Sequence, residues 1–138
     1  MQPLIVTAAI LCHNGRILIT RRPLEKQQGG LWEFPGGKLH GDESPEEGLK
    51  RELLEELGIE IVVGPIFEVA YYRYEWGPVV VLAYPCRQVS GVVRNLEVAE
   101  HRWIEPEEFP HFDILPADRP IVHKIMTARD CNQILFFR

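Results

Sequence analysis

One stretch, residues 37–59, constrains the fold of this chain most, because it contains the start and stop signals of a helix. Ser44 can cap the helix by accepting a hydrogen bond from a free N–H of the first turn. Pro45 then falls at the first helical position, where its missing N–H costs nothing. Glu47 completes a capping box with Ser44, and Gly58 suits the left-handed residue that ends a helix. We therefore predict a helix that begins at Pro45 and ends at Gly58.

This helix would present two different faces. Three carboxylates spaced i, i+3 and i+4 project from one side, namely those of Glu52, Glu55 and Glu56. A separate apolar stripe, which must face a core, is formed by Leu49, Leu53 and Leu57. Three carboxylates within one turn repel each other unless they are solvated or joined by a cation, and hard oxygen ligands suit Mg²⁺ or Mn²⁺. The residues alone leave both readings open. Gly48, in the interior of the helix, predicts a close approach at that point.

The spacing of the polar positions is more specific than their composition. Five residues separate Gly37 from Glu43, and seven more separate Glu43 from Arg51-Glu52-Leu53. One residue then precedes Glu55-Glu56, and one more precedes Gly58-Ile59. This pattern resembles the signature of the Nudix hydrolase family at every fixed position, and a chance match at a given start is on the order of one in a billion. The resemblance implies an α/β fold, a Nudix-type α/β/α sandwich with a mixed β-sheet between helices. We expect residues 1–138 to form a single Nudix hydrolase domain.

Size, charge and cysteine usage exclude several other classes. A length of 138 residues suits one domain, and a net charge of −5 argues against polymeric nucleic acid as a partner. The three cysteines are widely spaced and contain no CxxC pair, which predicts reduced thiols in a cytoplasmic protein. The apolar run at residues 3–12 lacks a basic leader and is too short to span a bilayer. We expect no membrane association and no obligatory protein partner.

Strand patterns lie on both sides of the helix. The expected strands are residues 4–12, 17–20, 33–34, 60–63, 66–74, 79–86 and 98–104. Asn14-Gly15 predicts a tight hairpin. We read residues 87–94 as a loop that can include a short strand, and 105–109 as a short helical turn or loop. A second helix is expected at residues 119–128 and a closing strand at 134–137. Aromatic residues crowd the hairpin near residues 71–76; such residues usually pack on a strand, although one could stack on a base.

The resemblance extends beyond the signature. Further segments are similar to the MutT branch of the family, namely residues 19–22, residues 32–38, Phe109 and residues 116–120. Enzymes of this branch clean nucleotide pools by cleaving oxidised nucleoside triphosphates to a monophosphate and pyrophosphate. The resemblance implies a Mg²⁺-dependent nucleoside triphosphate pyrophosphohydrolase, with Mn²⁺ as a substitute, acting on an oxidised substrate such as 8-oxo-dGTP. The alternative substrate is CTP or a modified pyrimidine nucleotide.

The resemblance also assigns roles to individual residues. The expected metal ligands are the carbonyl of Gly36 and the carboxylates of Glu52, Glu55, Glu56 and Glu97. The same four glutamates are the expected catalytic residues, although Glu97 could equally be a solvated loop carboxylate. Substrate contacts are expected from Arg22, Gln27, Glu33, Phe34, Pro35 and Gly36. Glu43 and Arg51 resemble the structural ion pair that fixes the loop to the helix; the alternative is a surface pair that contributes little stability.

Asp118 departs from the pattern of the branch and is also expected to contact the substrate. Some MutT enzymes have an asparagine there, which reads 8-oxoguanine through a donor and an acceptor. An ionised aspartate only accepts, whereas a protonated one could mimic asparagine if burial raised its pKa. Asp118 is also a natural N-cap for the second helix, and we favour the cap as its main role. Relatives that act on CTP and modified pyrimidine nucleotides also have aspartate at this position.

Two other functions remain as alternatives. One is a non-catalytic Nudix-fold sensor, but such domains usually lose signature carboxylates, and this chain keeps them all. The other is an enzyme that hydrolyses dinucleoside polyphosphates or ADP-ribose. The residues that mark such enzymes after the signature are not cleanly in register in this sequence.

Overall fold

Two long strands, β1 (Leu4–His13) and β7 (Gly77–Ser90), pair in parallel and form the centre of the sheet. The structure is a computed structural model that describes residues 2–127. The other strands are β2 (Arg16–Arg21), β3 (Trp32–Glu33), β4 (Gly36–Lys38), β5 (Glu60–Val63), β6 (Glu68–Tyr74) and β8 (Glu100–Ile104). The helices are α1 (Pro45–Leu57) and α2 (Arg119–Thr127), with 3₁₀ turns η1 (Pro106–His111) and η2 (Pro116–Asp118).

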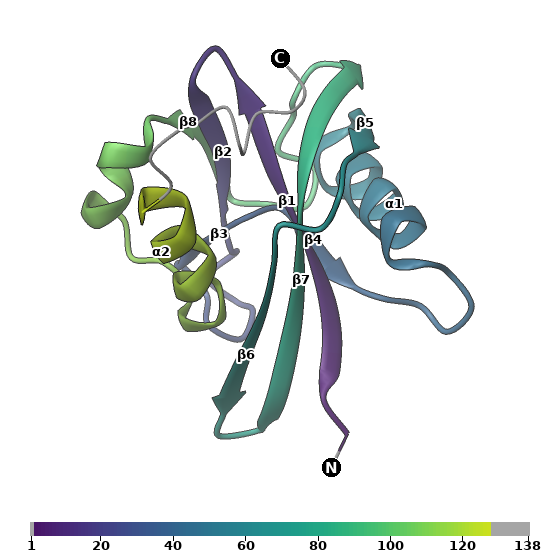
Figure 1. Cartoon of the computed structure of the whole chain (residues 1–138), viewed down its shortest axis with the longest axis vertical. Coiled ribbons are helices and arrows are strands. Elements are labelled where there is room, and N and C mark those ends of the chain that lie inside the picture. The colour runs from purple at the N-terminus through teal and green to yellow at the C-terminus, as the bar shows by residue number, and fades with distance from the viewer. Residues whose placement is uncertain (1, 128–138) are drawn as a thin grey trace.

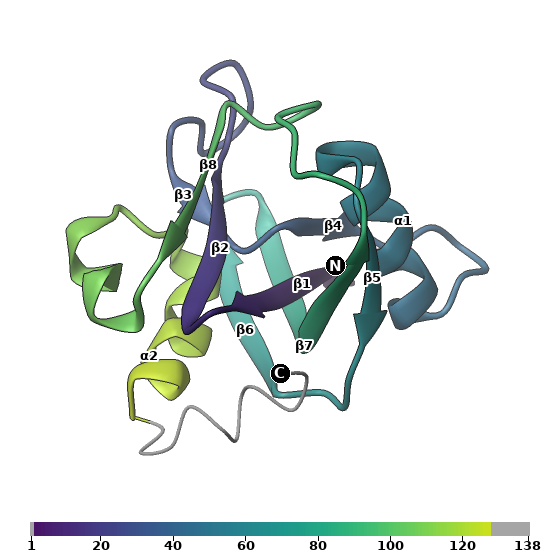
Figure 2. The same cartoon turned by 90° about the horizontal axis from the view of Figure 1, so that it is seen from above.

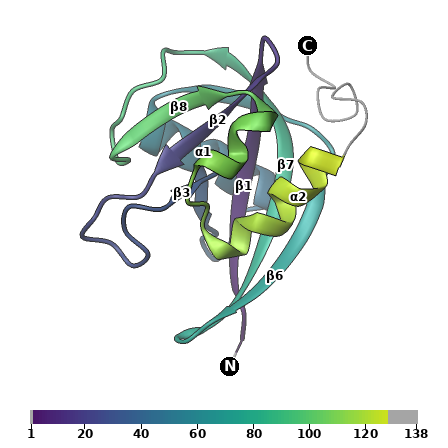
Figure 3. The same cartoon turned by 90° about the vertical axis from the view of Figure 1, so that its left-hand side faces the viewer.

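The sheet is mixed, as expected. Its main path runs β3-β2-β1-β7-β5, while β4 pairs with β1, β6 with β7, and β8 with β2. Only the β1–β7 pair is parallel among the strand pairs of residues 2–127; the others are antiparallel. Figures 1 and 2 show α1 and α2 on opposite sides of the sheet, and Figure 3 shows α2 lying near β6 and η1. The α/β/α arrangement is therefore confirmed.

Each helix buries one apolar stripe against its own side of the sheet. Leu49, Leu53 and Leu57 of α1 are 0% exposed and pack with residues of β1, β2 and β7. Ile121 and Ile125 of α2 join a second core cluster on the other face. Removing such a large apolar side chain from water is worth roughly 1.5–3 kcal/mol, so these two stripes are what hold the layers together.

The local signals read from the sequence are present. The Ser44 hydroxyl accepts from the Glu47 N–H (3.1 Å), and a Glu47 carboxylate oxygen accepts from the Ser44 N–H (3.2 Å). Gly58 has the left-handed conformation (φ 71°) that ends α1. Asn14 and Gly15 both have positive φ (51° and 76°), as the tight hairpin between β1 and β2 requires.

The structure corrects several boundaries. The expected loop at residues 87–94 is partly strand, because β7 continues to Ser90 by pairing with β5. The strands expected at 66–74 and 98–104 begin two residues later, at Glu68 and Glu100. The strand expected at 33–34 is Trp32–Glu33, and the turn after Glu105 is a 3₁₀ helix. Helix α2 is described to Thr127; residue 128 and the strand expected at 134–137 lie outside the described residues.

Candidate active site

A cavity of about 660 Å³ gathers residues that are far apart in the sequence. Its lining comes from β1, the loop between β2 and β3, the segment from β3 to β4, α1, the β6–β7 hairpin, the loop before β8, and η2. It includes nearly all the expected site residues, namely Arg22, Gln27, Glu33, Phe34, Gly36, Glu52, Glu55, Glu56, Glu97 and Asp118. Pro35 does not line this cavity; its carbonyl accepts a hydrogen bond from the Ala9 N–H (2.8 Å).

The glycine pair places β4 between β1 and α1. Gly36 has φ +153°, and a Cβ at this position would lie 2.0 Å from the Thr7 carbonyl oxygen. A Cβ on Gly37 would lie 2.5 Å from the carboxylate carbon of Glu52. Any larger residue would push the strand away from one of these neighbours. The absence of side chains therefore brings the β4 backbone against the acidic face of α1.

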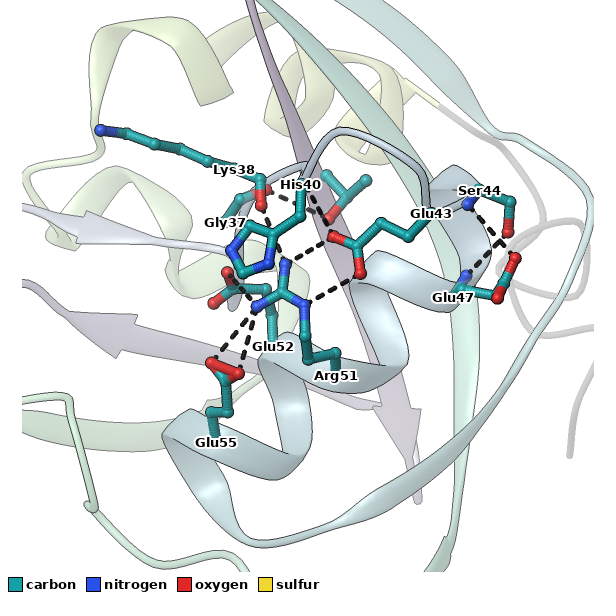
Figure 4. A network of polar contacts seen from close by, with 10 residues as sticks. Gly37, Lys38, His40, Glu43, Ser44, Glu47, Arg51, Glu52 and Glu55 are labelled. Atoms are coloured by element: carbon teal, nitrogen blue, oxygen red, sulfur yellow. Dashed lines mark hydrogen bonds and ion pairs between the residues drawn. The ribbon is translucent and has the colours of Figure 1, made fainter.

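Arg51 connects the loop before α1 to the acidic face (Figure 4). Its guanidinium bonds both Glu43 carboxylate oxygens, with Nη2–Oε1 2.7 Å and Nε–Oε2 3.0 Å, and donates to the Lys38 carbonyl (3.1 Å). Nη1 also contacts Oε1 of Glu52 (3.1 Å) and of Glu55 (3.2 Å). The Arg51 hydrogen bond, followed by that from the His40 backbone, lowers the pKa of Glu43 to about 2. Glu43 and Arg51 thus form the expected ion pair geometrically, and this pair also orients two of the α1 carboxylates.

Gly48 accounts for the close approach of this loop. A Cβ there would lie 2.6 Å from Leu39 Cδ2 and 2.9 Å from Glu43 Oε1. The loop thus rests on the helix where the side chain is missing, and Glu43 reaches Arg51 from that position.

Partly buried carboxyl groups meet on the cavity side of α1. Burial raises the pKa of Glu56 to about 9, with further contributions from the nearby charges of Glu33 and Glu52. Burial also raises the pKa of Glu33, although its partner Arg22 opposes the shift. Without a cation, the charged form of Glu56 is therefore disfavoured. A cluster of hard oxygen donors that repel each other in this way fits a divalent cation.

This cluster is not arranged in advance as a coordination shell. Within residues 2–127, no group of three or more His, Cys, Asp and Glu side chains is already placed to hold a metal ion. Glu52 and Glu55 instead contact Arg51. A bound cation would have to compete with this guanidinium for their oxygen atoms.

Glu97 is held beside α1 by main-chain contacts. The N–H groups of Leu96 and Glu97 both donate to the Glu56 carbonyl (3.0 and 3.2 Å), and the Arg94 N–H donates to the Leu57 carbonyl (2.9 Å). These bonds satisfy carbonyls that the helix end leaves without an intrahelical partner. The loop therefore places Glu97 on the cavity wall next to the helix that carries the other glutamates.

Basic residues line the cavity together with these carboxyl groups. Arg22 pairs with Glu33 (Nη1–Oε2 3.1 Å) and donates through Nε to the Gln27 carbonyl (2.9 Å). Lys26 and Lys38 also line the cavity. Gln27 thus contacts Arg22 through its backbone, which orients the guanidinium. Fixed cations beside a carboxyl cluster can bind an anionic substrate that arrives with its own metal ion.

Asp118 makes a contact that differs from the favoured sequence reading. It lies directly before α2, but its Oδ2 accepts a hydrogen bond from the Phe34 N–H (3.0 Å), so a cap is not the contact that defines its position. The residue is 4% exposed and lines the cavity. Burial, followed by the charge of Glu33, raises its pKa to about 8. At neutral pH the carboxyl group is therefore mostly protonated and can both donate and accept.

An apolar end of the cavity was not identified from the sequence. It is lined by Leu4, Val6, Val79, Val81, Tyr74 and Trp76. The crowding of aromatic residues at the hairpin was the available signal, since Tyr74 ends β6 and Trp76 lies in the turn that follows. Only the pairing of Leu4 with Val79 and Val6 with Val81 shows that β1 and β7 jointly form the floor.

Comparison with known proteins assigns the family. Residues 1–125 match the NUDIX domain. The chain belongs to the Nudix family. A solved relative, the Escherichia coli ORF135 protein, is 36% identical over 94% of both chains with a TM-score of 0.82. The MutT NUDIX hydrolase from Burkholderia pseudomallei is 26% identical, over 91% of this chain and 99% of that one, with a TM-score of 0.83.

Curated relatives of this Nudix hydrolase are enzymes. The CTP pyrophosphohydrolase of Escherichia coli is 38% identical over 94% of this chain and 96% of its own length. The 8-oxo-dGTP diphosphatase of Haemophilus influenzae is 30% identical over 91% and 93%. Nudix hydrolases generally need a divalent metal and act on nucleotides. Among residues 2–127, no helix is long and apolar enough to cross a membrane.

Proposed function

We propose that this Nudix hydrolase cleaves nucleoside triphosphates to a nucleoside monophosphate and pyrophosphate, with Mg²⁺ as its metal and Mn²⁺ as a substitute. One observation carries the proposal. A single cavity joins a cluster of carboxyl and basic groups, suited to metal and phosphates, to an apolar end whose Tyr74 bonds Ala117, the residue next to Asp118. Such a cavity has separate places for the two chemically different halves of a nucleotide.

Different residues of the cavity would bind the cation, contact the phosphate groups and accept a proton. Glu52, Glu55, Glu56 and Glu97, with the Gly36 carbonyl, would hold the cation, which when bound supplies charge neutralisation and a more acidic water. Arg22, which pairs with Glu33, would contact phosphate oxygens. Glu56 or Glu97 would accept the proton of the attacking water. Glu43 and Arg51 act on the reaction only by orienting the loop and the helix.

Asp118 favours two classes of base. In its protonated form it offers a donor and an acceptor side by side, which complements the N3 and N4 edge of cytosine. The same pair complements O6 and N7–H of 8-oxoguanine, whereas unmodified guanine has acceptors at both positions. We put cytosine nucleotides first, because the relative named CTP pyrophosphohydrolase has the higher identity of the two full-length relatives described above. The second candidate is 8-oxo-dGTP.

A substrate panel tests the proposal. CTP, dCTP, 8-oxo-dGTP, dGTP and UTP are assayed with Mg²⁺, with Mn²⁺ and with chelator, and kcat/KM is compared. We expect monophosphate and pyrophosphate from CTP or 8-oxo-dGTP, no turnover in chelator, and little activity on dGTP. Activity that persists in chelator, or nucleoside diphosphate and phosphate as products, would contradict the proposal.

Isotope labelling locates the bond that breaks. With ¹⁸O-labelled water, we expect the label in pyrophosphate, as attack at the β-phosphorus requires. Label in the monophosphate would indicate attack at the α-phosphorus and would separate this enzyme from the MutT branch. A cytoplasmic location, a single domain over residues 1–138 and the absence of an obligatory protein partner stay predictions.

A further inference from the structure

We propose that Trp76 forms the outer aromatic wall of the apolar end of the cavity, where the base would bind. It would thereby increase the affinity for substrates that carry a base. This inference rests on the proposed function. It concerns a residue in the turn of the β6–β7 hairpin, outside the Nudix signature and on a different element from the α1 carboxylates. Trp76 would therefore contribute affinity for the base without touching the reacting phosphate groups.

Trp76 belongs to a row of three rings on one face of the hairpin, formed by Tyr72, Tyr74 and Trp76. The Tyr74 and Trp76 rings are nearly parallel (7°), with centroids 5.2 Å apart. Tyr72 covers Tyr74 from the neighbouring position, with centroids 4.6 Å apart and the rings tilted by 59°. Tyr74 thus has ring neighbours at positions 72 and 76, whereas Trp76 is the last ring of the row.

The row is anchored next to the base-reading residue. The Tyr74 hydroxyl accepts a hydrogen bond from the Ala117 N–H (3.1 Å), and Ala117 directly precedes Asp118. Tyr74, Trp76, Ala117 and Asp118 all line the cavity. This bond fixes the tyrosine against η2, and the parallel stack then orients the indole. The indole therefore stands at a defined place relative to Asp118.

The remaining surface of Trp76 suits a base. The residue is 37% exposed, which is large for an indole, and the apolar floor made by β1 and β7 continues beside it. The β6–β7 turn lies near the start of β1 at the bottom of Figures 1 and 3. Because Trp76 lines the cavity and also keeps this exposure to solvent, its ring belongs to the rim of the cavity. An aromatic ring at the rim can stack on any base, because every base has a π-face. Asp118 then selects the edge, while Trp76 contributes affinity.

Kinetics with and without a base test this role. In Trp76→Leu we expect KM for CTP and for 8-oxo-dGTP to rise about tenfold with kcat changed by less than about twofold. Trp76→Phe keeps a ring and should recover most of the loss. On ribose 5-triphosphate, which has the phosphates but no base, Trp76→Leu and wild type should have equal kcat/KM. Tyr71→Leu is the matched control, because Tyr71 is 55% exposed on the same hairpin and does not line the cavity.

Binding gives a second readout that does not depend on hydrolysis. CMP should quench the tryptophan fluorescence of the wild type, ribose 5-phosphate should not, and Trp76→Phe should lose the quenching. Unchanged KM in Trp76→Leu, equal losses with and without a base, or quenching that persists in Trp76→Phe would overturn the inference. Wild type that binds CMP with quenching but hydrolyses no nucleoside triphosphate would instead refute the proposed function alone.

Discussion

Replacing Asp118 by asparagine should change how the stability of this protein depends on pH. The carboxyl group is 4% exposed, and its pKa is raised from 3.8 to about 8, first by burial and then by the charge of Glu33. Between these two values the folded protein keeps a proton that the unfolded chain has lost. The stabilisation is fully present below pH 4, and it is lost as the pH rises toward 8. Asparagine has no such titration.

The size of the effect follows from linkage. One proton difference changes the free energy of unfolding by about 1.4 kcal/mol per pH unit. Between pH 5 and pH 7 the wild type should therefore lose roughly 2–3 kcal/mol of unfolding free energy relative to Asp118→Asn. The amide oxygen of asparagine can still accept the hydrogen bond from the Phe34 N–H, so this contact is retained in the variant.

Urea unfolding of both proteins at pH 5, 6 and 7, in chelator, measures this difference. We expect the free energy of unfolding of the variant to rise relative to that of the wild type at each step in pH, with unchanged m-values. If the free energy of unfolding changes with pH equally in the wild type and in Asp118→Asn, Asp118 is ionised throughout this range. That result would refute the argument that the carboxyl group is protonated.

The same protonation should appear in substrate choice. Below pH 8, wild type and Asp118→Asn should rank the nucleotides alike, because the protonated carboxyl group and the amide both donate and accept. Above pH 8, the wild type alone should lose discrimination, by roughly ten- to a hundredfold in kcat/KM. A ranking that differs at pH 7 would show that the ionised carboxylate reads the base.

Three further perturbations address the helix and its carboxylates. Glu56→Gln should lower kcat by about two to four orders of magnitude without destabilising the fold in chelator, and near-normal turnover would remove Glu56 from the site. Arg51→Lys should lower the melting temperature and activity together, because lysine cannot bond both Glu43 oxygens; an unchanged melting temperature would leave the pair without a structural role. Leu53→Ala should cost about 2–5 kcal/mol of unfolding free energy, whereas Leu54→Ala, at a 53% exposed position, should cost much less; equal losses would contradict the assigned helix faces.

The local structure of α1 was predictable because its determinants are close in sequence. The capping box at Ser44 and the left-handed Gly58 act within a few residues, and the structure has both. The two faces of the helix follow from its period, so the buried leucines and the acidic side were expected together. Strand ends were less predictable. The extension of β7 to Ser90 depends on pairing with β5, which propensity cannot report.

The sequence by itself therefore determined the helix, its acidic face, the hairpin at Asn14 and the family signature. Each of these features depends on residues that are close together in the sequence. Only the tertiary structure decided what the other groups do. From the sequence alone, Asp118 is predicted to cap the second helix. Folding instead places it beside Phe34, 84 residues away, in surroundings that favour its protonated form. Glu97 reaches α1 only because its loop supplies N–H groups to the open carbonyls of the helix end. Burial and long-range contact have no local signature, and these two quantities set the charge and the position of the candidate site.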